Sequence, residues 1–133
     1  MNPEIIIATW LQDATVSAVI GDRYASPYLP SNSEFPALVY NLVDATPQPF
    51  VAAQGERELA QCRMQFNPIA TSIGGVKQTA EVLRSLFDFK HHQTIAGKLV
   101  VSMRLIDAGP MEKDSESGLF MQRFDYRMFW YET

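Results

Sequence analysis

The sequence predicts an α+β fold in which a mostly antiparallel sheet of four strands, or slightly more, carries two helices packed on one face. Two segments place apolar residues at helical spacing, and four segments alternate apolar with polar residues. They follow one another as helix, strand, strand, helix, strand, strand, an order typical of a two-layer domain. At 133 residues, the chain is expected to form a single domain spanning residues 1–133.

The first predicted helix runs from residue 2 to residue 20. Asn2 is a favourable capping residue, and Pro3 suits the first helical position. Gly21 is the predicted end of this helix, and the proline-containing stretch after it is expected to be irregular. The apolar residues at helical spacing are Ile7, Trp10, Leu11, Ala14 and Ala18.

A long loop separates the first two predicted strands. The first strand covers residues 35–43, and the second covers residues 58–66, where Pro68 then interrupts the pattern. One face of the second strand is formed by Ala60, Cys62, Met64 and Phe66. The loop, residues 44–57, contains two prolines and is long for a compact domain, which is more typical of a functional segment.

The second predicted helix begins after Thr71 or Ser72, either of which can cap it, and ends near residues 90–92. Its apolar stripe is Val76, Ala80, Leu83 and Phe87, and its solvent side carries Lys77, Gln78, Glu81 and Arg84. Residues 95–97 are expected to form a turn or short strand. The third main strand then covers residues 98–107, with Leu99, Val101, Met103 and Leu105 aligned on one face.

The last predicted strand, residues 118–131, is the segment around which the sheet is organised. Its even positions are apolar except for Gln122, namely Phe120, Phe124, Tyr126, Met128 and Trp130. Its odd positions carry Arg123, Asp125 and Arg127 in the middle. Such strict alternation predicts a long, half-buried strand in the centre of the sheet. The preceding residues, 108–117, form a polar and acidic connection.

Composition argues against several classes of protein. The net charge of −4 disfavours a chain whose main role is to grip nucleic acid. No apolar stretch approaches the roughly 20 residues that a membrane helix needs. The first residues lack the basic segment of a secretion signal, so we expect synthesis in a cytoplasm. Cys62 is the single cysteine, which excludes an internal disulfide.

Each candidate for catalysis or metal binding has a better structural explanation. Cys62 lies on an apolar row and fits a small buried side chain. His91 and His92 suit a solvated helix end, because adjacent histidines point apart. Residues 72–77 resemble a phosphate loop but lack the Walker spacing, and the acidic connection lacks the later ligands of a calcium loop. We therefore expect no enzyme activity, no cofactor and no metal.

Two features are better explained by protein partners. The loop of residues 44–57 carries an apolar pair at its tip, and the odd side of the last strand is apolar at both ends. A neighbouring subunit explains the apolar ends, as does cover by a loop or by the first helix of the same chain. The predicted partner or subunit contacts are Phe50, Val51, Gln54, Arg57, Glu112, Asp114 and Glu116.

Several motifs follow one another along the chain: Val19-Ile20-Gly21-Asp22-Arg23-Tyr24, Phe35-Pro36-Ala37-Leu38-Val39-Tyr40, Cys62-Arg63-Met64-Gln65-Phe66, Gly118-Leu119-Phe120, and Arg123-Phe124-Asp125-Tyr126-Arg127-Met128-Phe129-Trp130-Tyr131. In this order and spacing they resemble the phage tail-completion proteins of the tail-to-head joining, or tail-terminator, type. The resemblance runs through nearly the whole chain.

The resemblance implies a structural virion protein, made in the bacterial host cytoplasm, that forms a ring at the head-proximal end of a phage tail tube. The ring, typically a homo-hexamer, would end tube polymerisation and join tail to head. Implied partners are the tail tube protein, a head-side stopper or neck protein, the sheath terminus of a contractile tail, and genomic DNA that passes through the lumen without sequence-specific binding. No membrane is implied. The alternatives are a head-completion or stopper neck protein, and a small ligand-binding or enzymatic α+β domain.

Overall fold

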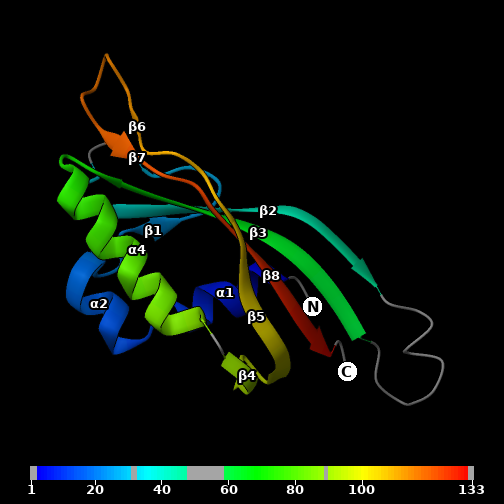
Figure 1. Ribbon diagram of the computed structural model, residues 1–133. Helices are drawn as coiled ribbons and strands as arrows, with labels where there is room; N and C mark the ends of the chain where they lie inside the picture. Colours follow the sequence, from blue (N-terminus) through cyan, green and yellow to red (C-terminus); the bar gives the residue numbers. More distant parts are fainter. Residues whose placement is uncertain (1–2, 31–32, 48–58, 89, 132–133) are drawn as a thin grey trace.

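The computed structural model describes residues 3–30, 33–47, 59–88 and 90–131. In these residues the fold is mixed α/β, with three helices and a strongly curled sheet of eight strands (Figure 1). The predicted four-stranded sheet with two helices is therefore wrong. An internal cap divides the first helix, and short strands form in segments that the sequence marks as irregular.

The final segment does lie in the centre of the sheet, as predicted. The strand order is β1 (Tyr24–Ala25), β2 (Ala37–Pro47), β3 (Leu59–Ala70), β8 (Phe124–Tyr131), β5 (Lys98–Ala108) and β4 (Lys90–Ile95). Neighbours pair antiparallel except β1 and β2, which pair parallel. Strands β6 (Glu112–Lys113) and β7 (Phe120–Met121) form a hairpin that joins the sheet through β3.

The N-terminal segment forms two helices, α1 (Pro3–Trp10) and α2 (Ala14–Ile20), instead of the one predicted. Asp13 caps α2, because its carboxylate accepts hydrogen bonds from the Thr15 hydroxyl at 2.7 Å and the Thr15 amide at 2.9 Å. These bonds lower the pKa of Asp13. Gly21 ends α2 as predicted, with a φ of 59°. The predicted Asn2 cap lies outside the described residues.

Both β2 and β3 are longer than predicted, and β3 continues through Pro68 to Ala70. Pro68 stands opposite Leu38, whose amide donates to Arg23 on the β1 side at 2.9 Å. The nitrogen of Pro68 therefore points away from β2, toward the interval where β8 has ended and β7 has not begun. The missing donor removes no ladder hydrogen bond, so the strand tolerates proline.

Helix α4 (Ile73–Phe87) begins at the cap Ser72 and buries its predicted stripe, with the predicted solvent side exposed. It ends earlier than predicted, because residues 90–95 form strand β4. His91 and His92 therefore lie exposed on a strand, and their assignment to a helix end is wrong. Ala96 and Gly97 then make a turn with φ of 53° and 77°, which returns the chain into β5.

Strand β5 has the predicted position but a different inner face. A bulge between Val100 and Ser102 shifts the alternation, so Val100 and Met103 are buried, while Leu99, Val101 and Leu105 are only half-buried. The predicted row is therefore wrong at Leu99 and Val101, before the bulge, whereas Met103 and Leu105 share the inner face, opposite Met128 and Tyr126. The segment 118–131 is also interrupted, at residues 122–123, between β7 and β8.

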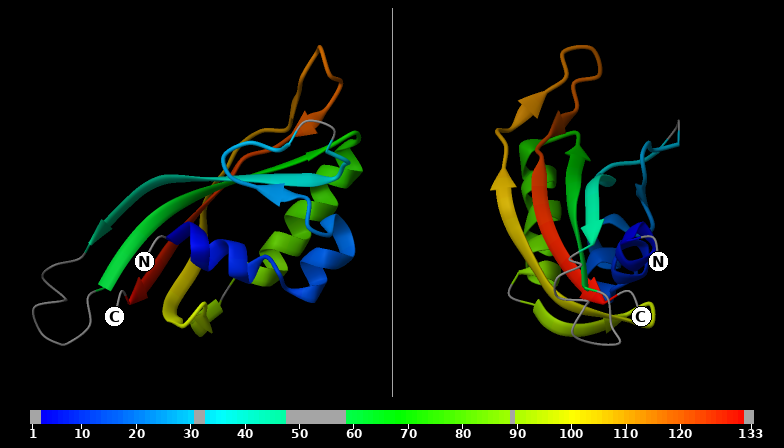
Figure 2. Two further views of the ribbon diagram at one scale, coloured as in Figure 1. Left: turned by 180° about the vertical axis from the view of Figure 1, so that it is seen from behind. Right: turned by 90° about the vertical axis from the view of Figure 1, so that its right-hand side faces the viewer.

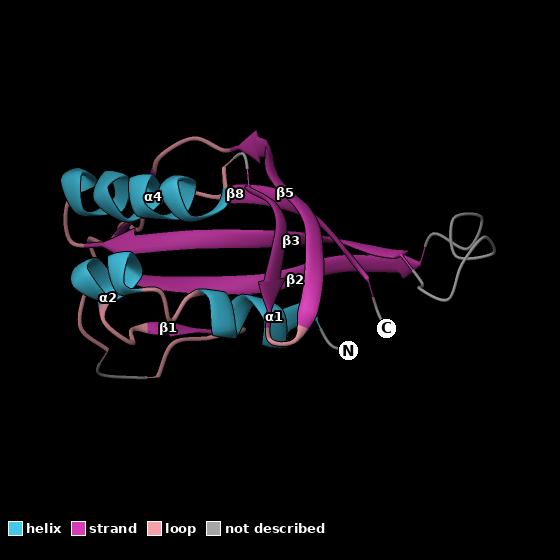
Figure 3. Cartoon of the chain, turned by 90° about the horizontal axis from the view of Figure 1, so that it is seen from below, coloured by secondary structure: helices cyan, strands magenta, loops and turns pink. Residues whose placement is uncertain are grey.

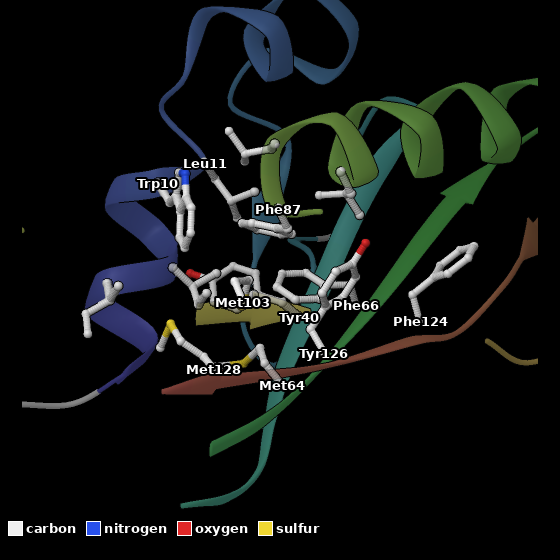
Figure 4. Packing of buried hydrophobic residues seen from close by; sticks show 14 of the residues in the cluster. Trp10, Leu11, Tyr40, Met64, Phe66, Phe87, Met103, Phe124, Tyr126 and Met128 are labelled. Atoms are coloured by element: carbon white, nitrogen blue, oxygen red, sulfur yellow. The ribbon is translucent and has the colours of Figure 1, made fainter. Parts of the chain in front are cut away.

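The core lies between the sheet and the helices (Figure 4). The even positions of β3 and β8 are buried as predicted, including Phe66, Tyr126 and Trp130. Phe87 of α4 contacts the Phe66 and Tyr126 rings at 5.1 and 5.3 Å between centroids, and Trp10 meets Phe87 edge-on at 5.0 Å. These aromatic contacts join α1, α4 and the two central strands.

All three helices lie on the same side of the sheet (Figures 2 and 3). Helix α1 contacts both β2 and β4, although β3, β8 and β5 lie between these two strands in the sheet. The sheet therefore curls around α1, and no helix of the described residues lies on its opposite side. No helix in the described part of the chain is long and apolar enough to cross a membrane.

Candidate functional site

The predicted contact residues divide into two groups. Phe50, Val51, Gln54 and Arg57 lie outside the described residues. Glu112, Asp114 and Glu116 are all exposed on the β6–β7 hairpin. This hairpin stands at one end of the molecule, whereas β2 and β3 reach toward the other end where the loop begins (Figures 1 and 2). The two predicted contact segments therefore leave opposite ends of the sheet.

The hairpin loop is held by its own polar groups. The Asp114 carboxylate accepts hydrogen bonds from the Ser117 hydroxyl at 2.7 Å and the Ser117 amide at 3.3 Å. These bonds lower the pKa of Asp114, so the side chain is anionic at neutral pH. The Lys113 ammonium lies 5.4 Å from the centre of the Phe120 ring. The loop thus presents carboxylates in a fixed turn.

A row of arginines crosses the side of the sheet that faces away from the helices. Arg127 of β8 is the direct cross-strand neighbour of Arg63 on β3 and of Arg104 on β5. We call Arg63, Arg127 and Arg104 the arginine row. Arg63 and Arg127 alternate with the apolar rows predicted for their strands, but the sequence could not bring them together, because strand register was unknown.

Carboxylates compensate one end of this surface. Asp125 is only 2% exposed and forms an ion pair with Arg63, which raises the pKa of that guanidinium. The Arg123 guanidinium lies 3.8 Å from the Asp125 carboxylate and donates to Asp107 at 2.9 Å. Asp107 and Asp125 are direct cross-strand neighbours, and they form the next pair on this side of the sheet after Arg104 and Arg127. Their charges are therefore already matched by Arg63 and Arg123.

Arg127 and Arg104 are not compensated in this way. Neither forms a hydrogen bond or ion pair with any residue that the structure describes, and Arg104 is exposed while Arg127 is half-buried. Like charges directly opposite one another destabilise a sheet. The two side chains together form a site that favours an anion from outside the described chain.

A groove of about 580 Å³ adjoins the β5 end of the row. Strand β4 pairs with β5 only as far as Met103, so residues 104–108 have no strand on that edge within the described ranges. Arg84 and Asp88 pair with each other at 2.8 Å in the groove wall. The groove lining is Arg84, Asp88, His91, Ser102, Met103, Arg104, Leu105 and Phe129.

The residues weighed for catalysis take structural places. Cys62 is buried, and its thiol pKa is raised to about 12. Burial is the larger cause, and the nearby Asp44 charge is the smaller one. Residues 73–77 form the first turn of α4, where the Ser72 hydroxyl accepts from the Gly75 amide at 3.1 Å. No group of three or more His, Cys, Asp or Glu in the described residues is arranged to hold a metal ion.

No protein-family model and no curated protein matches this sequence. The fold, however, is similar to that of a chain in a solved structure titled "Virion of native gene transfer agent (GTA) particle". The two chains align with a TM-score of 0.67 at 12% identity, over 98% of this chain and 94% of the other. At this identity the likeness establishes a shared fold over nearly the full length of both chains.

Proposed function

We propose that this protein is a structural component of a phage or phage-like virion and has no enzymatic role. The observation that carries the proposal is the fold shared, end to end, with a chain of a gene transfer agent virion. The likeness covers 98% of this chain and 94% of the other, so it involves the whole domain and not a shared fragment. Fold alone does not establish function, so the sequence motifs supply the second argument.

Within the virion, the protein acts as a tail terminator. Copies associate into a ring, typically a hexamer, on the head-proximal end of the tail tube, where the ring ends polymerisation and joins the tail to the head-side neck. The motif order resembling tail-completion proteins supports this role. So does the shape of the sheet, since the β6–β7 hairpin stands at one end, the described ends of β2 and β3 stand at the other, and a subunit between tube and neck must present a surface to each. Contacts between unlike surfaces of identical copies generate a ring when the rotation closes.

Deletion of the reading frame, followed by negative-stain electron microscopy of the lysate, tests this function. Filled heads beside unjoined tails, many of abnormal length, are expected, and a plasmid copy of the gene should restore joined particles. If the protein instead closes the head, heads made without it cannot retain their DNA. Heads that have lost their DNA, beside free tails of normal length, would therefore reassign the protein to a head-side stopper. Intact infectious particles would contradict both roles.

A further inference from the structure

The acidic hairpin and the arginine row are complementary surfaces on different parts of one chain. We infer that the β6–β7 hairpin of one copy docks on the arginine row and the adjoining groove of the next copy. The hairpin supplies the carboxylates of Glu112, Asp114 and Glu116, and the acceptor surface supplies the guanidinium groups of Arg104 and Arg127. This inference rests on the ring of the proposed function and names the contact that closes it.

The charges that remain free on each surface are of opposite sign. On the hairpin, the three carboxylates are exposed and the one lysine, Lys113, lies over the Phe120 ring. On the acceptor side, Arg63 is matched by Asp125 and Arg123 by Asp107. Asp44 is exposed next to Arg63, at the end of the row farthest from β5. The uncompensated charge is therefore cationic and lies at Arg127 and Arg104.

The shapes of the two surfaces also agree. The hairpin is a narrow projection beyond the end of the sheet (Figure 2), whereas the acceptor is a groove of about 580 Å³ beside the free edge of β5. Half-buried Phe129, on the odd side of the last strand, lines this groove. Docking would therefore cover one of the apolar positions for which a neighbouring subunit is one of the two predicted explanations. Because projection and groove are different surfaces, the contact is heterologous and repeats from copy to copy.

An acidic protein segment fits this surface better than nucleic acid does. Binding to a phosphate backbone draws its strength from several neutralised phosphates. Among the described residues of this surface, two arginines are uncompensated, and the carboxylates of Asp107 and Asp125 lie beside them. Two cations beside a groove match a short acidic turn, and the β6–β7 hairpin of this chain is such a turn.

Charge reversal in the particle tests the contact. Arg104→Glu or Arg127→Glu, supplied in trans to the deletion, is expected to lower the yield of joined particles by about tenfold or more, since like charges would then meet across the interface. Either change removes repulsion within the arginine row, so the isolated subunit should melt at the wild-type temperature or above. Lys77→Glu makes the same charge change on the exposed side of α4 and should leave the yield unchanged.

The complementary exchange makes the test specific. Glu112→Lys with Glu116→Lys should also lower the yield, and Asp114 is left in place because it holds the hairpin turn. Combining both lysine changes with Arg104→Glu and Arg127→Glu in one chain should recover at least part of the lost yield. If all variants fold and the combined variant recovers none of the lost yield of joined particles, the inference is overturned.

Cysteine cross-linking gives a direct readout. The native Cys62 is buried, so Ser115→Cys on the hairpin and Ser102→Cys in the groove provide the reactive pair. A chain carrying both should give a cross-linked ladder up to the full ring in assembled particles, whereas either single variant should give none. Absence of the ladder in particles that join normally would overturn the contact and leave the terminator function standing. Arginine variants that assemble normally but lose salt-dependent DNA binding would assign the row to nucleic acid and also overturn it.

Discussion

At the level of single residues, burial determines how Cys62 and Tyr126 ionise. Both side chains lie on the inner face of the sheet, and the Tyr126 hydroxyl donates to the Asp88 carboxylate at 3.2 Å. Burial is the main cause that raises the pKa of each group, with Asp44 and Asp88 adding to it. The thiol pKa of about 12 leaves Cys62 almost entirely protonated at physiological pH, which makes it chemically inert.

These raised pKa values predict a loss of stability at alkaline pH. Their contributions are fully present below the ordinary pKa values of 9.0 for the thiol and 10.0 for the phenol, because both states are then protonated. Above pH 9 the unfolded state releases the thiol proton first, so the free energy of unfolding falls by roughly 1 kcal/mol per pH unit for Cys62. Urea titrations between pH 8 and 11 measure this slope. Cys62→Ala should flatten it, whereas Met64→Leu, on the same row, should not; equal slopes in all three proteins would contradict the assignment.

At the level of elements, the start of α4 explains the paired glycines of residues 72–77. A Cβ on Gly75 would lie 2.7 Å from the Cβ of Ala70, which is closer than real side chains approach. A Cβ on Gly74 would find no atom nearer than the Ser72 hydroxyl at 4.0 Å. Gly75 therefore allows the first turn of α4 to pack closely on the end of β3, and this packing explains the motif without a phosphate.

Alanine at the two glycines should thus have opposite effects. Gly74→Ala is expected to raise the free energy of unfolding by roughly 0.5–1 kcal/mol, because alanine favours the helix. Gly75→Ala is expected to lower it by about 1–3 kcal/mol, since α4 must shift away from β3. Chemical denaturation of the two variants measures the difference. If both variants were stabilised, the close contact between α4 and β3 would be wrong.

The cap of α4 gives a second comparison at this scale. Sequence left Thr71 and Ser72 as equal candidates, and only Ser72 accepts a hydrogen bond from the helix, from Gly75. Ser72→Ala should lower the free energy of unfolding by about 1 kcal/mol. Thr71→Ala, on the adjacent exposed residue, should change it by less than about 0.5 kcal/mol. Thermal melts followed by circular dichroism distinguish the two, and a larger effect at Thr71 would move the cap.

Sequence patterns predicted elements well where one regular repeat continued without interruption. The rows of β3 and β8 and the stripe of α4 are buried as predicted, because each depends only on the spacing of neighbouring residues. Prediction failed at Pro68 and at the bulge after Val100. In both cases the pairing with an adjacent strand decides the outcome. At Pro68 that pairing requires no backbone donor, so the strand continues, and in β5 the pairing with β8 includes a bulge that shifts the alternation.

At the level of the whole molecule, the sheet curls far enough for α1 to contact strands near both of its edges. Trp10 stabilises this arrangement, because its side chain is only 7% exposed and packs edge-on against Phe87 of α4. No helix of the described residues covers the outer side of the sheet. The arginine row on that side is therefore accessible to a neighbouring copy, and the groove lies beside it at the edge of β5.

Removal of the Trp10 side chain should loosen the whole assembly of helices and sheet. Trp10→Ala is expected to lower the free energy of unfolding by about 3–5 kcal/mol, through lost burial and the cavity that remains. Ile5→Ala, on the same helix with the side chain 51% exposed, is the matched control and should cost less than about 0.5 kcal/mol. Denaturant unfolding compares them, and a small effect at Trp10 would mean that α1 does not contribute to closing the curled sheet.

The sequence by itself determined which residues face the core in β3, β8 and α4, the central position of the last strand, and the acidic character of the hairpin. These properties follow from local spacing and composition. Only the tertiary structure decided the eight-stranded curl and the meeting of Arg63, Arg127 and Arg104. Those depend on strand register, which shifts by whole residues without changing any local pattern, and on which edges remain unpaired once the strands have assembled.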